Sequence, residues 1–144
     1  MTTPSYLATP QKYWFDGNKL IYFQQRLQDF LDGKRIMPIS IDAGIHKGCN
    51  IRCKFCYGIK QGKNAKYIPK DRLLLLAEDM SECGVKAIAI IGDGEPTLNP
   101  GLYPFVNRLK LMGVDSAVAT NGLLLDKEKI DLLKSKLTWL RFNV

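Results

Sequence analysis

Segments that resemble buried strands alternate with helical segments from residue 36 onward, and this alternation restricts the fold more than any other feature. The clearest strand, residues 85–91, is apolar on both faces and rich in β-branched residues, as is typical of a strand buried in a parallel sheet. Further strands are expected at three segments: 36–43, 116–120 and 137–144. Helices are expected between them, at residues 69–84, at residues 99–113 and from Asp126. The pattern predicts an α/β fold of right-handed parallel β/α units.

The chain divides into an N-terminal extension, residues 1–35, and a core domain, residues 36–144. Within the extension, apolar residues at helical spacing predict a helix over residues 18–32, with Gly33 at its end. No repeat, low-complexity tract or linker interrupts the core, which predicts a single domain there. The last strand has no helix after it in this sequence, so we expect a core that is incomplete at its C-terminal end.

Charge and hydropathy narrow the classes of partner. The formal net charge is +7, but the basic residues are scattered, densest over residues 47–70, and no recognised nucleic-acid motif accompanies them. A solvated surface, or a site for an acidic electron donor or anionic substrate, is favoured over nucleic acid. The apolar runs are too short to cross a bilayer, and no leader is recognisable, so we expect a cytoplasmic protein without membrane contact.

Cys49, Cys53 and Cys56 form the most specific chemical signal. Cysteines this crowded suit metal ligation better than disulfides, and one compact loop can direct three thiolates onto a cubic iron–sulfur cluster. Such clusters ordinarily take four thiolates, so one iron would stay open to a chelating ligand. The alternative is a structural zinc site completed by His46 or Cys83, although paired Cys-x-x-Cys knuckles are missing. Otherwise Cys83 is expected to be a small core residue at a helix end.

The remaining motifs follow successive strands. The cysteine segment comes after the first strand, Gly94-Glu95-Pro96 after the second, and Asn121-Gly122 after the third. In β/α folds, chemistry gathers at the carboxyl ends of the strands, so these motifs are expected at one edge of the sheet. Ordinary turns between strand and helix are the alternative interpretation of the two shorter motifs.

The Cys-x-x-x-Cys-x-x-Cys spacing, with Phe55 just before the last cysteine, resembles the signature of the radical SAM superfamily. The resemblance implies a partial TIM-type barrel, here about four parallel strands of an expected six, preceded by an N-terminal helix. It also implies a [4Fe-4S] cluster on Cys49, Cys53 and Cys56 that reductively cleaves S-adenosylmethionine. The resulting 5′-deoxyadenosyl radical would abstract hydrogen from an unidentified substrate.

Further residues match the same family. Gly94, Glu95 and Pro96 resemble its Gly-Gly-Glu-Pro element, which binds the methionyl amino group, although Asp93 replaces the first glycine. By the same resemblance, Asn121 would lie near the cofactor and Asn143 would reach its ribose hydroxyls.

The resemblance also implies an electron donor. Basic residues near the cysteines, Lys47, Arg52 and Lys54, suit an acidic donor such as flavodoxin or ferredoxin. His46 is expected to be a surface or hydrogen-bonded residue. Two other functions compete with the enzyme: a non-catalytic zinc or iron–sulfur module, and a basic nucleic-acid-binding protein.

Overall fold

A computed structural model describes residues 22–60 and 66–143, which fall into two compact units, residues 1–36 and residues 37–144. Each unit is described by itself. None of the described helices is both long and apolar enough to cross a membrane.

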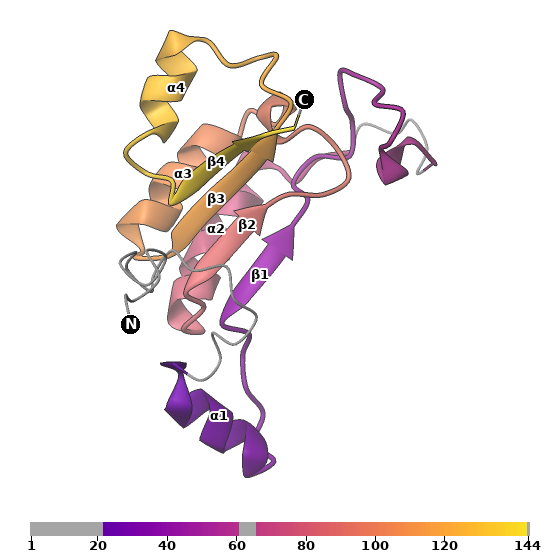
Figure 1. Ribbon diagram of the computed structural model, residues 1–144. Helices are drawn as coiled ribbons and strands as arrows, with labels where there is room; N and C mark the ends of the chain where they lie inside the picture. The colour runs from indigo at the N-terminus through magenta and orange to yellow at the C-terminus, as the bar shows by residue number, and fades with distance from the viewer. Residues whose placement is uncertain (1–21, 61–65, 144) are drawn as a thin grey trace, which may run out of the picture. The chain divides into compact units, whose positions relative to one another are not determined.

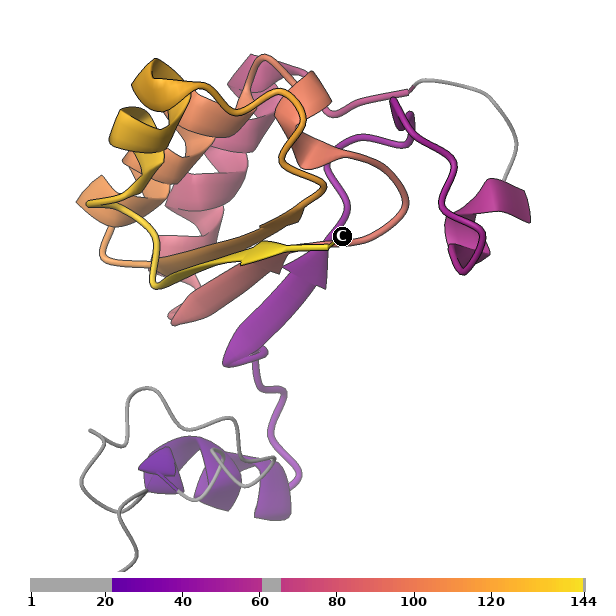
Figure 2. The same ribbon diagram turned by 45° about the horizontal axis from the view of Figure 1, so that its top comes forward.

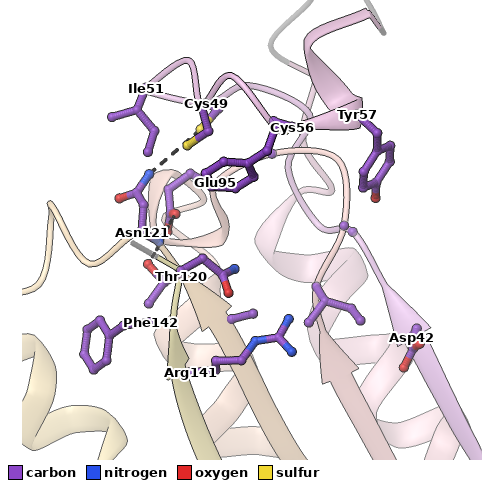
Figure 3. A pocket seen from close by; sticks show the side chains of 18 residues that line it. Asp42, Cys49, Ile51, Cys56, Tyr57, Glu95, Thr120, Asn121, Arg141 and Phe142 are labelled. Carbon is purple, nitrogen blue, oxygen red and sulfur yellow. Dashed lines mark hydrogen bonds between the residues drawn. The ribbon is translucent and has the colours of Figure 1, made fainter.

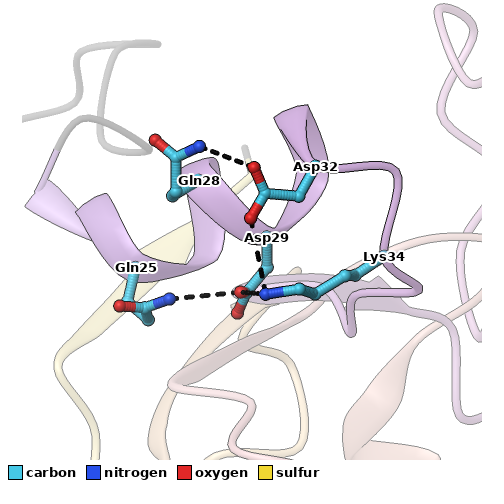
Figure 4. Close-up of polar contacts among 5 residues, drawn as sticks. All are labelled: Gln25, Gln28, Asp29, Asp32 and Lys34. Carbon is cyan, nitrogen blue, oxygen red and sulfur yellow. Dashed lines mark hydrogen bonds and ion pairs between the residues drawn. The ribbon is translucent and has the colours of Figure 1, made fainter.

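Helix α1 (Gln24–Leu31) lies in the first unit and inside the range predicted to be helical, whose first residues fall outside the described part. Its polar contacts centre on Asp29, which accepts hydrogen bonds from Gln25 Nε2 at 3.1 Å and from Lys34 Nζ at 2.8 Å (Figure 4). The bond from the Lys34 ammonium, followed by that from Gln25, lowers the pKa of the Asp29 carboxyl. Lys34 follows the helix and so ties its last turn to the chain that leaves it.

The second unit contains one four-stranded parallel sheet in the order β1-β2-β3-β4 (Figure 1). The strands are β1 (Ser40–Ala43), β2 (Ala87–Ile90), β3 (Asp115–Thr120) and β4 (Trp139–Phe142). The predicted α/β fold is confirmed, and all four strands lie within or close to their predicted ranges.

Strand β1 begins later than predicted, at Ser40 instead of residue 36. Pro38 has no backbone N–H to donate to a ladder. Next to the start of the strand, the Ile39 carbonyl accepts a hydrogen bond from the Lys86 N–H at 2.7 Å.

Helices α2 (Lys70–Glu82), α3 (Leu102–Leu111) and α4 (Lys127–Leu133) cover one face of this sheet (Figure 2). The core between them is formed by alternate strand residues and by the inner faces of the helices, including Ile88, Ile90, Val118, Leu73, Phe105 and Leu109. Because strand side chains alternate, Ala89, Ala117 and Ala119 face the opposite side. On the side of the sheet away from these helices, the central strands β2 and β3 therefore present alanines.

Two short 3-10 helices were not predicted: η4 (Tyr57–Lys60), which follows the cysteines, and η5 (Pro96–Leu98), which follows Glu95. Each is a single turn, too short to leave a periodic pattern of apolar residues.

The cysteines lie in the long connection between β1 and α2, residues 44–69, which we call the cysteine loop. Its two ends are held together by the Ile68 N–H, which donates to the Ile45 carbonyl at 3.0 Å. The fully buried Asn99 amide donates to the same carbonyl at 2.9 Å and to the Ile68 carbonyl at 3.1 Å. The base of the loop is thus fixed to the segment that follows β2.

Candidate functional site

A cavity of about 820 Å³ lies at the carboxyl ends of the four strands (Figure 3). Each strand end contributes to its lining, and most of the residues predicted for the site are among those that line it: Cys49, Cys53, Phe55, Cys56, Gly94, Glu95, Asn121 and Asn143. The structure therefore brings residues almost one hundred positions apart to one edge of the sheet, as the parallel arrangement predicts.

All three cysteines of the motif are free thiols that border this cavity. Cys49 and Cys56 are exposed, Cys53 is half-buried, and the Cys56 N–H donates to the Cys53 carbonyl at 3.1 Å. Within residues 22–60 and 66–143, however, no three His, Cys, Asp or Glu side chains converge closely enough to hold a metal ion. A cubic cluster does not need such a point, because each thiolate binds a different iron, so three thiols around one cavity are a donor set that fits a [4Fe-4S] cluster in chemistry.

Cys83 lies away from the cavity and does not supply a fourth ligand. It is the C-terminal cap of α2 and is exposed, so the expectation of a small core residue was wrong. The helix presents Leu73, Ala77 and Met80 to the core, and Cys83 falls beyond that face.

Close backbone contact joins the cysteine loop to the segment after β2. A Cβ added at Gly94 would overlap the carbonyl oxygens of His46 and Gly48, and the next residue, Glu95, donates its N–H to Gly48 O at 2.9 Å. Position 94 must therefore be glycine, and it is. Asp93, which replaces the first glycine of the family's element, precedes the residue that makes this contact. Glycine in the motif serves packing between two loops.

His46 is a structural residue of that contact. It is 9% exposed, its Nδ1 lies 2.9 Å from Gly48 O, and its ring stacks on Tyr67 at 5.9 Å between centroids. It does not line the cavity, so the expectation of a hydrogen-bonded histidine describes it best.

Glu95 carries a buried carboxylate, 2% exposed, with four hydrogen bonds. Oε1 accepts from the Thr97 N–H at 3.0 Å, the Thr97 hydroxyl at 2.6 Å and the Thr120 hydroxyl at 2.5 Å. Among the residues that the structure describes, Oε2 accepts from the Asn121 N–H alone, at 2.8 Å. A buried charge needs such partners, and here they leave acceptor capacity on Oε2 (Figure 3).

The threonine partners of Glu95 were not predicted. Thr97 and Thr120 are both buried, and Thr120 lies at the end of β3, so the carboxylate ties the loop after β2 to the next strand. Only the neighbouring Thr97 could have been suspected from the motif, because a residue two positions after a capping carboxylate commonly donates to it. Pro96 is buried at the start of η5 and does not line the cavity, unlike its predicted neighbours.

Asn121 is fixed by contacts within the chain. Its Oδ1 accepts from the Leu123 N–H at 3.0 Å, and its Nδ2 donates to Asn50 Oδ1 at 2.8 Å and to Cys49 Sγ at 3.8 Å. Asn143 follows β4, is exposed, and borders the cavity. Phe55 also borders it and is 77% exposed.

Arg141 is a cavity residue that the sequence reasoning missed. It lies on β4 opposite Ala119, on the face lined by alanines, with its guanidinium 5.9 Å from the centroid of the Trp139 ring. Among the described residues it forms no ion pair, because Glu95 is engaged and Asp42 is three strands away, roughly 14 Å. Side chains two positions apart on a strand share a face, so its position two residues before Asn143 was the signal that could have identified it.

Comparison with known proteins gives a match to the family model described as "Radical SAM superfamily" over residues 45–144. The chain is 30% identical over 123 residues to an S-adenosylmethionine-dependent nucleotide dehydratase of Flammeovirga pacifica, covering 82% of this chain and 42% of that protein. It is 38% identical over 127 residues to a GTP 3′,8-cyclase of Staphylococcus epidermidis, covering 82% of this chain and 36% of the relative. The chain thus spans well under half of the curated relatives it matches.

Two solved structures share the fold. BtrN in complex with AdoMet and 2-DOIA matches with a TM-score of 0.63 at 20% identity, over 72% of this chain and 44% of BtrN. Streptococcus suis SuiB bound to S-adenosylmethionine matches with a TM-score of 0.64 at 18% identity, over 92% of this chain and 31% of SuiB.

Proposed function

This chain belongs to the radical SAM superfamily, and we propose that its cavity holds a [4Fe-4S] cluster and S-adenosylmethionine for radical chemistry on a substrate. The observation that carries the proposal is that all three motif cysteines and the Glu95 carboxylate border one cavity at the strand ends. When bound, the two groups would supply reductive cleavage of the sulfonium to methionine and a 5′-deoxyadenosyl radical, which takes a hydrogen atom from the substrate.

The three cysteines would act as thiolate ligands to three irons, and the fourth iron would be left to the methionyl amino and carboxylate groups. Exposure of Cys49 and Cys56 supports access to a cluster, and Cys53 borders the same cavity. Phe55 would cover the cluster from the loop side.

Glu95 would accept a hydrogen bond from the methionyl ammonium. Its Oε1 already has three donors, so the cofactor would use the free capacity of Oε2. Gly94 allows the cysteine loop to approach this carboxylate, Pro96 fixes the turn that follows it, and Asn143 would bind the ribose hydroxyls.

Anaerobic reconstitution of the wild-type protein tests the function. We expect about four irons and a matching amount of sulfide per chain, with the absorption and paramagnetic resonance spectra of a [4Fe-4S] cluster. Dithionite and S-adenosylmethionine should then yield 5′-deoxyadenosine.

Two outcomes would contradict this proposal. Zinc bound without iron would favour the non-catalytic module, and RNA affinity with a steep dependence on salt would favour the nucleic-acid-binding protein.

An acidic electron donor such as flavodoxin or ferredoxin would complete the system. Exposed Lys47, Arg52 and Lys54 on the cysteine loop support this proposal, because their positive charge steers and orients an acidic partner.

We infer that the substrate carries phosphate. Both curated relatives have names that specify nucleotide chemistry, and the cavity contains the guanidinium of Arg141, which forms no ion pair among the described residues, beside the small side chain of Ala119. A planar guanidinium pairs well with phosphate oxygens.

Arg141→Gln should weaken the binding of GTP, used as a probe, by about tenfold, since a charge-assisted contact with phosphate is lost. Isothermal titration calorimetry of the reconstituted protein measures this. Arg108→Gln removes the same charge from α3, outside the cavity, and should leave binding unchanged. Equal losses in both variants would show that only net charge matters.

A further inference from the structure

The side-chain amide of Asn121 has a single allowed orientation. Its Oδ1 accepts from the Leu123 N–H at 3.0 Å, and a rotation by 180° would set the amide nitrogen against that donor. The backbone of the same residue is held by Glu95 Oε2. The NH₂ group therefore faces the cysteine loop.

Each of the two N–H bonds of this group has a partner on that loop. One donates to Asn50 Oδ1 at 2.8 Å. The other donates to Cys49 Sγ at 3.8 Å, a length suited to the large sulfur atom, and this contact is drawn in Figure 3. In the described part of the chain, neither Cys53 nor Cys56 receives a hydrogen bond at sulfur. The contact is specific to one thiol of the three.

We propose that Asn121 is a positioning residue that donates a hydrogen bond to the Cys49 thiolate of the cluster and thereby raises the cluster's reduction potential. Hydrogen bonds to the sulfurs are among the factors that set the potentials of iron–sulfur centres. Reduction adds negative charge that is shared with the sulfur ligands, so an N–H donor stabilises the reduced state more than the oxidised one. This role rests on the proposed cluster, but it differs from contact with the cofactor's nucleoside.

The test is a redox titration of the reconstituted protein, in which paramagnetic resonance measures the reduced cluster. Asn121→Ala and Asn121→Asp both remove the donor, and the aspartate keeps the acceptor for Leu123. We expect the equilibrium constant for one-electron reduction to fall about tenfold in Asn121→Ala, which is about 59 mV, and further in the charged variant. Affinity for S-adenosylmethionine should stay within about twofold in Asn121→Ala, because the hydrogen-bonding groups of the Asn121 amide already have partners within the protein.

Asn50→Ala is the matched control, since it removes the second acceptor and leaves the donor to Cys49 in place. Its potential should equal or exceed that of the wild type. An unchanged potential in Asn121→Ala would overturn the inference while leaving the proposed function intact, as would loss of the cluster from both Asn121 variants. A wild-type protein that binds no iron would reject the proposed function, and this inference with it.

Discussion

Serine at position 49, 53 or 56 is expected to reduce bound iron from about four to less than one per chain after anaerobic reconstitution. Each thiolate would supply one of only three protein ligands to the cluster, and a serine hydroxyl is a poor ligand for iron at neutral pH. Production of 5′-deoxyadenosine should disappear with the iron. Iron analysis and the cluster's visible absorption measure the effect.

The fold should survive these changes, because Cys49 and Cys56 are exposed in an irregular loop and substitutions at such sites usually change stability by less than about 0.5 kcal/mol. Cys83→Ser is the matched control: this thiol is exposed at the end of α2, outside the cavity, and its loss should leave the iron content unchanged. If Cys83→Ser lost iron as the others do, the three-cysteine assignment would fail.

Glu95→Gln is expected to weaken S-adenosylmethionine binding at least tenfold and also to lower the free energy of unfolding by about 1–3 kcal/mol. The neutral side chain loses its attraction for the methionyl ammonium. If its oxygen replaces Oε1 beside the three donors, its NH₂ group faces the Asn121 N–H, donor against donor. Calorimetric binding and denaturant unfolding of the same preparation separate the two effects.

Thr97→Val provides the control for stability. It removes one donor to Glu95 and retains the carboxylate, so it should lower stability with a much smaller loss of cofactor affinity. If both variants lost affinity in proportion to their loss of stability, Glu95 would have a structural role alone.

The strands and helices of the second unit were predictable because their signals are local. The apolar run that predicts a strand over residues 85–91 forms β2, and Pro69 and Gly84 bracket α2 as expected. The placement of the motifs at one edge of the sheet was also predictable, because the carboxyl ends of parallel strands meet at the same edge.

The features of the site that the sequence did not predict depend on contacts between segments that are distant in the chain. Thr120 joins Glu95 across 25 positions, and the Asn121 amide reaches the cysteine loop across more than 70, so neither contact leaves a pattern in the nearby sequence. Arg141 faces the cavity because of the register in which β4 pairs with β3, and this register could not be known from the sequence.

The clamp that Asn99 forms at the base of the cysteine loop has a consequence for the entropy of loop closure. Both ends of the loop are already fixed by hydrogen bonds to Asn99 and to each other, so the loop is closed at its base whatever its length. Doubling the length of a flexible loop costs only about 0.6 kcal/mol. A change in loop length that keeps the contacts of Gly48 with Glu95 and of Cys49 with Asn121 should therefore have little effect on the stability of the strands that support the loop.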